Sequence, residues 1–167
     1  MKTAIMLALL ITLVVPNPPQ GVRLDATIQR YDRIAIQRFS NTLPARYRVN
    51  IPLVLVSMPT DYDGGETCGY YDDQPPQRIV LHHSCFAGGV FRHEFAHHLW
   101  STVLNDYERN GWKRIWKLLW SKMPNSNAQT DSEEGWAECW DALYSRLPLD
   151  PLIRREISQY RVQRIQP

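Results

Sequence analysis

The sequence lacks the features that mark membrane, fibrous and repeat proteins. No apolar run reaches the roughly 18 residues that suggest a membrane-spanning helix, and the 12 prolines and 8 glycines follow no period. With 44% hydrophobic and 22% charged residues, the composition is that of a folded protein. Polytopic membrane, collagen and solenoid folds are therefore excluded, and 167 residues suit one compact domain.

The chain has little excess charge, at a formal net charge of +2. We interpret the arginines of its C-terminal segment as the solvated face of a helix, with a membrane or nucleic-acid contact as the alternative. Because charge alone does not call for a nucleic-acid partner, none is predicted. These arginines are Arg154, Arg155, Arg161 and Arg164.

Cysteine is also scarce, and three cysteines cannot all pair within one chain. A bridge between Cys68 and Cys85 is the plausible pairing, because their separation suits two strands of one hairpin. Cys139 would then keep its thiol or cross-link to another chain. The cysteines give only weak support for an oxidising compartment.

The first 24 residues resemble an export signal. A basic start at Lys2 precedes the apolar run 4–15, which ends at the Pro- and Gly-rich segment 16–21. No small-x-small cleavage triplet follows closely, and a short membrane anchor or a buried strand are the alternatives. Twelve helical residues span only about 18 Å of a core about 30 Å thick, which disfavours the anchor. We therefore predict a secreted or membrane-associated protein with its folded domain at residues 25–167.

The apolar pattern predicts an α+β fold for this domain. Branched and aromatic residues predict a small, mainly antiparallel sheet of about three strands, at residues 49–58, 69–71 and 78–82. Helical spacing and capping signals predict helices at residues 25–40, 88–105, 111–122, 130–147 and 152–165.

One of these helices carries an H-E-x-x-H motif, from His93 to His97. Because a helix turns 100° per residue, the two histidines project from one face, a turn apart, and can hold one zinc ion. Glu94 points toward the same side and can accept a proton from water. We interpret the adjacent His98 as a packing or an exposed residue rather than a ligand.

Catalytic zinc ordinarily has three protein ligands and one open position, so a third ligand must come from elsewhere. Glu134 is the best candidate, with Glu133 or Glu138 as the fallback. Glu138 lies one helical turn after Glu134 and can fix a ligating histidine through a hydrogen bond. The alternative reading of Glu134 is an acid that favours the start of its helix.

The H-E-x-x-H motif together with the E-x-x-A-E element that begins at Glu134 resembles the gluzincin metallopeptidases. The similar branch contains the anthrax lethal factor catalytic domain and the Pro-Pro endopeptidases. The resemblance implies a zincin-like fold in which the sheet packs on the motif helix, and one catalytic zinc ion. It also implies the roles of five residues: His93, His97 and Glu134 as ligands, Glu94 as general base and Glu138 as the partner of a ligand.

The chain departs from these relatives at one position. Seven residues before the ligating glutamate they have a tyrosine that steadies the oxyanion, whereas this chain has Asn127. Unranked candidates for that role are His82, His83 and Tyr107.

Two functions follow as hypotheses. The first is a zinc-dependent metalloendopeptidase that cleaves peptide or protein substrates, with the strand at residues 78–82 on the cleft rim pairing with an extended substrate. The second is a non-catalytic, zinc-stabilised module whose basic, tryptophan-rich helix contacts a membrane surface or a protein partner. A structural zinc site needs no glutamate beside its first ligand, which favours the enzyme. Both aromatic stripes, Trp112, Trp116 and Trp120 and then Trp136, Trp140 and Tyr144, are interpreted first as packing.

Overall fold

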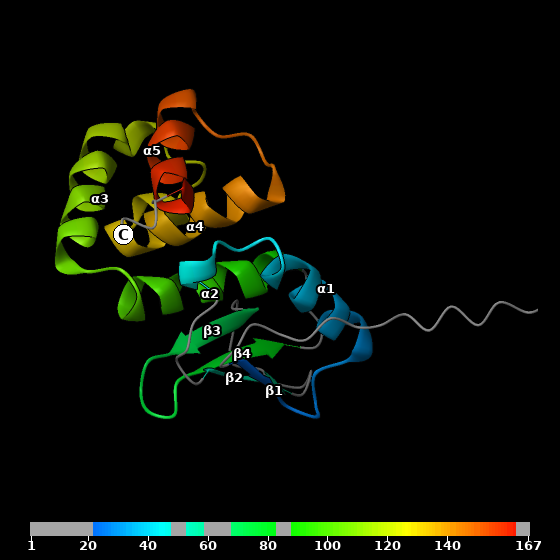
Figure 1. Ribbon diagram of the computed structural model, residues 1–167. Coiled ribbons are helices and arrows are strands. Elements are labelled where there is room, and N and C mark those ends of the chain that lie inside the picture. Colours follow the sequence, from blue (N-terminus) through cyan, green and yellow to red (C-terminus); the bar gives the residue numbers. More distant parts are fainter. Residues whose placement is uncertain (1–21, 48–52, 59–67, 83–87, 163–167) are drawn as a thin grey trace, which may run out of the picture.

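The computed structural model describes residues 22–47, 53–58, 68–82 and 88–162. These residues form an α+β fold, as predicted, with a sheet at one side and helices stacked above it (Figure 1). The strands are β1 (Val22–Leu24), β2 (Leu53–Met58), β3 (Gly69–Asp72) and β4 (Arg78–His82). The helices are α1 (Arg30–Ser40), α2 (Gly88–Thr102), α3 (Asp106–Leu119), α4 (Ser132–Ser145) and α5 (Pro151–Val162). Short 3-10 turns lie at Ala45–Tyr47, Trp120–Lys122 and Asn127–Gln129.

The sheet is mixed and four-stranded, so the expected antiparallel sheet of three strands is wrong. Its order is β1-β2-β4-β3, with β1, β2 and β4 parallel and β3 antiparallel to β4. The expected hairpin does form between β3 and β4, where Asp72 pairs with Arg78. However, β2 pairs with the other side of β4. Local patterns identify strands but not which neighbour each strand pairs with, because pairing depends on the whole chain path.

The fourth strand, β1, had no sequence signal, because three residues are too few for a period. It pairs with β2 from Val22↔Leu53 to Leu24↔Leu55, and α1 forms the connection between these two parallel strands. The sheet therefore includes residues that precede the expected domain start at residue 25. The rest of the predicted export segment, residues 1–21, lies outside the described residues. In the part of the chain that the structure describes, no helix has the length and apolar character needed to cross a membrane.

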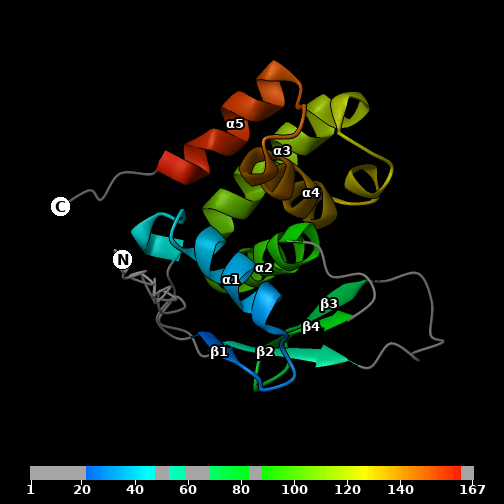
Figure 2. The same ribbon diagram turned by 90° about the vertical axis from the view of Figure 1, so that its right-hand side faces the viewer.

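Helix α2 is the centre of the fold. The sheet covers one side of it and α4 packs on the other, while α3 and α5 pack around α4 (Figures 1 and 2). Aromatic rings join these layers: Phe39 of α1 meets Phe91, Phe95 and Trp140 edge-on at centroid distances of 5.7, 6.1 and 5.6 Å. Trp136 and Trp140 are fully buried, which confirms that they are core residues.

The helix starts follow their capping residues. Helix α4 begins after Asp131, whose carboxylate accepts the backbone N–H groups of Glu133 and Glu134 at 2.7 and 3.0 Å. Helix α3 begins five residues earlier than expected, because Asn105 and Glu108 form a reciprocal capping box.

The first tryptophan stripe packs on the chain that leads into α4. Trp112 is fully buried, whereas Trp120 retains 47% exposure. Each indole N–H donates to a backbone carbonyl, at 2.7 to 2.9 Å. The packing interpretation is therefore confirmed for Trp112 and for the partly buried Trp116, but not for the exposed Trp120. The three indole hydrogen bonds hold the segment that leads into α4. The donor and acceptor pairs are Trp112 with Ser132, Trp116 with Ala128, and Trp120 with Gln129.

The cysteines lie in two environments. Cys68 is disulfide-bonded, and its predicted partner, Cys85, lies outside the described residues. Cys139 is a free, buried cysteine whose thiol pKa is raised to about 12 by burial.

Candidate metal centre

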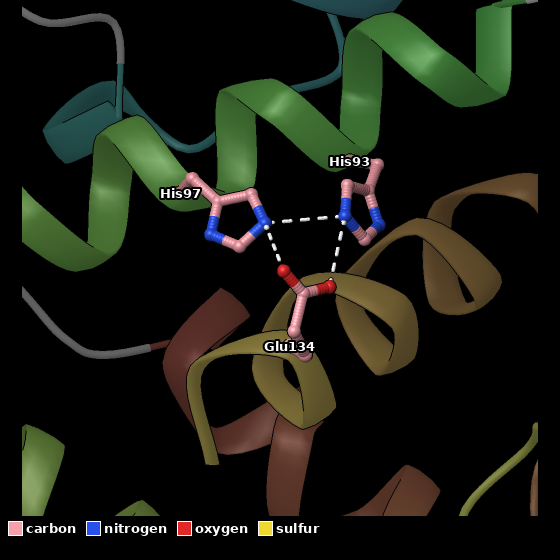
Figure 3. A group of neighbouring side chains, drawn as sticks. All are labelled: His93, His97 and Glu134. Carbon is pink, nitrogen blue, oxygen red and sulfur yellow. Dashed lines mark hydrogen bonds and ion pairs between the residues drawn. The ribbon is translucent and has the colours of Figure 1, made fainter. Parts of the chain in front are cut away.

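The two histidines of the motif lie side by side on α2 and face α4. Their Nε2 atoms are 3.1 Å apart and their ring centroids 4.9 Å apart (Figure 3). Both side chains are mostly buried, with 19% exposure for His93 and 12% for His97. The single helical turn between them produces this arrangement, as the sequence spacing predicts.

Glu134 reaches both histidines from the first turn of α4. Its Oε2 lies 3.3 Å from Nε2 of His93, and its Oε1 lies 3.3 Å from Nε2 of His97 (Figure 3). The Asp131 cap fixes where this first turn begins. The structure therefore brings together the three residues predicted as ligands, from segments 37 or more residues apart.

The arrangement fits a zinc ion in both chemistry and spacing. Two imidazole nitrogens and one carboxylate oxygen form a common donor set for catalytic zinc. Bonds of about 2.0–2.1 Å to a tetrahedral zinc place its ligand atoms roughly 3.3 Å apart, which matches the observed separations of 3.1 and 3.3 Å. Among the described residues, this is the one group of three or more His, Cys, Asp or Glu whose donor atoms converge in this way.

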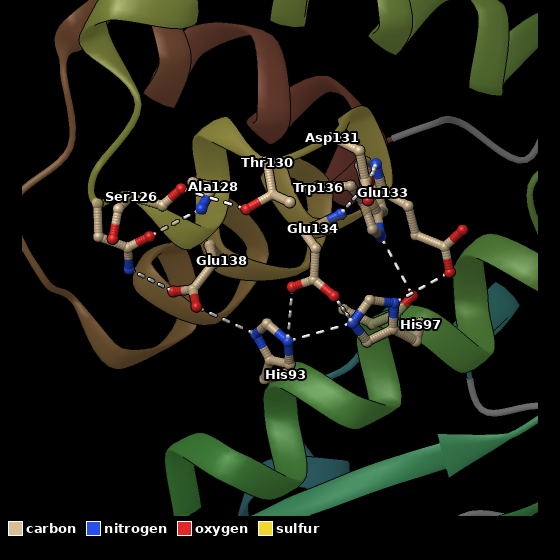
Figure 4. A network of polar contacts seen from close by, with 12 residues as sticks. His93, His97, Ser126, Ala128, Thr130, Asp131, Glu133, Glu134, Trp136 and Glu138 are labelled. Atoms are coloured by element: carbon tan, nitrogen blue, oxygen red, sulfur yellow. Dashed lines mark hydrogen bonds and ion pairs between the residues drawn. The ribbon is translucent and has the colours of Figure 1, made fainter. Parts of the chain in front are cut away.

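Each histidine has a second carboxylate on its other ring nitrogen (Figure 4). Oε1 of Glu138 lies 3.6 Å from Nδ1 of His93, and Oε1 of Glu133 lies 3.0 Å from Nδ1 of His97. Asn125 anchors Glu138 by donating to its Oε2 at 2.8 Å. Carboxylates at this position fix the ring orientation and tautomer of a metal-binding histidine.

Glu133 is a residue whose role the sequence analysis missed. It was considered only as a fallback ligand, yet its carboxylate contacts the outer nitrogen of His97. Adjacent helical residues point 100° apart, so helix geometry alone does not predict that Glu133 and Glu134 both reach α2. The one signal in the sequence was the pair of acids in the first turn of a helix expected to face two histidines.

Charge interactions shift the pKa values of these groups. Burial lowers the pKa of His97, but hydrogen bonds to Glu133 and Glu134 outweigh burial and raise it to about 10. The pKa of His93 is also raised, because the Glu134 bond and the charge of Glu94 outweigh the opposing effect of burial. The hydrogen bonds from both histidines hold the pKa of Glu134 well below its usual range. These shifts favour a protonated imidazole beside the Glu134 carboxylate when no metal is bound.

Glu94 lies on α2 beside the two histidines and is 8% exposed. Burial raises the pKa of its carboxyl group, while the positive charge of His93 and His97 lowers it. The backbone N–H of Tyr71, on β3, donates a hydrogen bond to the carboxylate. A buried carboxylate with a raised pKa is suited to accept a proton near neutral pH.

These groups open into a cavity of about 1000 Å³ between β3, α2 and the start of α4. Its lining is acidic, and no lysine or arginine is among the described residues that form it. The carboxylates are Asp73, Glu94, Asp131, Glu133, Glu134, Glu138 and Asp141. Asp141 is neutralised by Arg92, whose Nε lies 2.5 Å from its Oδ1.

The edge of the sheet at this cavity is β3, which corrects the expectation for residues 78–82. Strand β4 is paired on both sides and has no free edge for another strand. Just before β3, the carbonyl of Cys68 accepts from the N–H of His82 at 2.8 Å. Because antiparallel pairing alternates, the backbone groups of Gly69 and Tyr71 point to the open edge instead.

The oxyanion candidates fall in different places. His82 is buried in β4 and Tyr107 is 81% exposed on α3, and neither is among the described residues that line the cavity. His83 lies outside the described residues. Asn127, which replaces the tyrosine of the similar peptidases, does line the cavity.

His98 is fully buried, which confirms that it is a packing residue. Its Nδ1 lies 3.2 Å from the hydroxyl of Tyr71, and its ring packs against Phe95. Burial lowers the pKa of His98 to about 4, so its ring is neutral at physiological pH.

No protein-family model matches the chain, and no curated protein is significantly similar to it.

Proposed function

We propose that this chain is a zinc-dependent metalloendopeptidase, as its resemblance to the gluzincins implies. The observation that carries the proposal is the triangle of His93, His97 and Glu134 ligand atoms beside the buried Glu94, at an open cavity. A structural zinc site would fill its positions with cysteine or histidine and would need neither the base nor the cavity.

The roles of the residues follow from their positions. Zinc, when bound by His93, His97 and Glu134, would supply a Lewis acid that activates water and polarises a peptide carbonyl. Glu94 accepts a proton from the attacking water and returns it to the leaving amine. Glu133 and Glu138 keep the two imidazole rings oriented toward one another.

The cavity favours an extended and basic peptide as the substrate. An extended segment can pair with the open edge of β3, where Gly69 presents its backbone N–H and C=O. The acidic lining attracts lysine or arginine side chains on either side of the scissile bond.

The non-catalytic binding module is the alternative, and the tryptophan packing argues against it. Trp112 and Trp116 face the protein interior, with their indole N–H groups bonded to carbonyls of the chain before α4. These two rings are not free to dock on a membrane surface or partner.

Zinc analysis and a peptide-library assay on three variants test the proposal. The wild-type chain should bind one zinc ion and cleave peptides. Glu94→Gln should retain zinc and lose at least about 100-fold in kcat, since general bases contribute roughly 10²–10⁴-fold. Glu134→Ala should lose both zinc and activity. The control Glu156→Gln, on α5 and away from the cavity lining, should retain both.

Two results would contradict the proposal. Cleavage by Glu94→Gln at the wild-type rate would exclude the mechanism. A wild-type chain that needs zinc to fold yet cleaves no peptide of the library would favour the binding module.

A further inference from the structure

One stripe of α2 faces β3 rather than α4. Val90, Glu94 and His98 follow one another at intervals of four residues and therefore lie on one face of the helix. His93 and His97 belong to the neighbouring face, which meets Glu134. Helix α2 thus directs the two proposed zinc ligands toward α4 and the proposed general base, Glu94, toward β3.

Tyr71 contacts two members of this stripe. Its backbone N–H donates to the carboxylate of Glu94, and its hydroxyl lies 3.2 Å from Nδ1 of His98. The rings of Tyr71 and His98 also meet at a centroid distance of 5.5 Å. One residue of β3 therefore bridges an i, i+4 pair on α2.

The hydrogen bonds around His98 favour one tautomer. Thr102 donates its hydroxyl proton to the backbone carbonyl of His98 at 2.6 Å. The same hydroxyl oxygen lies 3.5 Å from Nε2 of His98, where it is left to accept. This arrangement favours the tautomer with its proton on Nε2, in which Nδ1 accepts the proton of the Tyr71 hydroxyl.

Strand β3 rests on α2 at a second point. A Cβ added to Gly69 would lie 2.9 Å from Cγ1 of Val90 and 2.7 Å from the carbonyl oxygen of Val80. The strand and the helix are thus in close contact here, which leaves no room for a side chain. The contact between Tyr71 and His98 is the other point. Together the two contacts fix the distance between β3 and α2 and the position of β3 along the helix.

We propose that Tyr71 and His98 are positioning residues that hold the Glu94 carboxylate in its working orientation. The hydrogen bond to His98 fixes the Tyr71 side chain, and the side chain fixes the outward N–H that binds Glu94. This inference rests on the proposed function, because Glu94 is the general base only in a peptidase. Through Tyr71, the edge strand β3 then helps to orient the general base, a role that none of the proposed zinc ligands has.

The test compares Tyr71→Phe with Tyr31→Phe. Both changes remove one hydroxyl and keep the ring, but Tyr31 is 77% exposed on α1 and is not among the described residues that line the cavity. We expect Tyr71→Phe to lower kcat about tenfold, because small displacements of reacting groups are costly. KM and zinc content should stay at the wild-type value, and Tyr31→Phe should leave all three quantities unchanged.

His98 is tested with a graded pair. His98→Phe fills the buried space but removes the acceptor, so kcat should fall as it does in Tyr71→Phe. His98→Asn keeps an amide oxygen at the position of Nδ1 that can accept the Tyr71 hydroxyl, and kcat should recover in part. If His98 had a purely structural role, its substitution would lower stability without lowering kcat at an unchanged KM.

Nuclear magnetic resonance gives a readout that does not depend on cleavage. In the wild-type chain, the His98 ring should show a protonated Nε2 and an unprotonated Nδ1. The amide hydrogen at position 71 should exchange with solvent about tenfold faster in Tyr71→Phe and His98→Phe than in the wild-type chain and Tyr31→Phe.

These measurements separate the two proposals. If the wild-type chain cleaves peptides and Tyr71→Phe retains its kcat, the positioning inference is wrong and the peptidase stands. If the wild-type chain cleaves nothing, the proposed function fails, and the exchange rate at position 71 decides whether the His98 contact holds this amide. Unchanged exchange in both variants would then overturn the contact as well.

Discussion

The two helices that form the candidate centre are positioned by different means. Helix α2 supplies His93, Glu94 and His97, whose relative positions follow from the geometry of one helical turn. Helix α4 supplies Glu133, Glu134 and Glu138, which reach the ring nitrogens of the histidines only if the whole helix lies at the correct distance from α2. The comparison shows that a motif within one element is robust, whereas a ligand from another element depends on packing between them.

Several contacts hold α4 against α2. The indole of Trp136 donates to the carbonyl of Ala96 on α2 at 3.2 Å. Close approach also requires a glycine beside the proposed ligand, because a Cβ at Gly135 would lie 2.5 Å from Trp116 and 2.9 Å from the carbonyl oxygen of Ala128. The position of Glu134 therefore depends on residues that never touch the metal centre.

Among the variants that test how α4 is positioned, Gly135→Ala should have the largest effect on stability and zinc affinity. The added methyl group overlaps Trp116 and a backbone carbonyl, and overpacking of this kind costs about 1–3 kcal/mol of folding free energy. Zinc affinity should fall too, because the first turn of α4 is displaced. Chemical denaturation and zinc titration measure the two effects.

Gly111→Ala is the matched control, in the middle of α3. A Cβ there meets only the Tyr160 hydroxyl, at an ordinary 3.6 Å. Since alanine favours helix over glycine by about 1 kcal/mol, this variant should be slightly more stable and bind zinc normally. Equal effects from both substitutions would refute the special role of Gly135.

Competition between zinc and protons for the nitrogens of His93 and His97 should have the next largest effect on zinc affinity. Zinc binds neutral imidazole, whereas the pKa of His97 is raised to about 10 and that of His93 is raised as well. Zinc affinity should therefore fall as the pH is lowered, by about tenfold per pH unit for each proton displaced. Zinc titration between pH 6 and 9 measures this slope, and a pH-independent affinity would contradict the assignment.

The metal-free chain should respond to pH in the opposite sense. The raised pKa of His97 contributes stability that is fully present below its unfolded value of about 6.5 and is lost as the pH rises through about 10. The lowered pKa of Glu134 contributes stability above its ordinary value, which is lost as the pH falls. The melting temperature of chelator-treated protein should thus decline above neutral pH while zinc affinity rises.

The smallest effect is expected for the outer carboxylates. Glu133→Gln and Glu138→Gln keep the shape of the side chain but remove its charge from His97 and His93 respectively. Each should weaken zinc binding by about tenfold, the lower end for partners of metal ligands. Because the Glu133 contact is shorter, at 3.0 Å against 3.6 Å, its loss should cost more. The reverse order would indicate that the Asn125 anchor makes Glu138 the stronger partner.

Much of the local structure was predictable from the sequence. The H-E-x-x-H spacing placed His93 and His97 on one helix face, and the Asp131 cap marked the start of α4. Burial of Trp136 and Trp140 followed from their spacing of four. These features depend on residues within a turn or two of one another, where helix geometry and hydrogen bonding act directly.

The errors about the sheet concerned contacts between distant segments. Strand β2 was expected in a mainly antiparallel sheet but lies parallel to β4, and the edge strand at the cavity is β3 rather than the strand at residues 78–82. The start of α3 was a local error, because the capping box of Asn105 and Glu108 begins this helix at Asp106 rather than at Gly111.

The sequence by itself determined the chemistry available to this protein: two histidines and a glutamate on one helical turn, and acids at the start of a later helix. Tertiary structure decided which acid meets which nitrogen, with Glu134 between the histidines and Glu133 and Glu138 on their outer sides. It also placed Tyr71 over Glu94 and His98. The physical reason is that spacing along a helix is fixed by backbone geometry, whereas distances between elements are set by how their side chains pack.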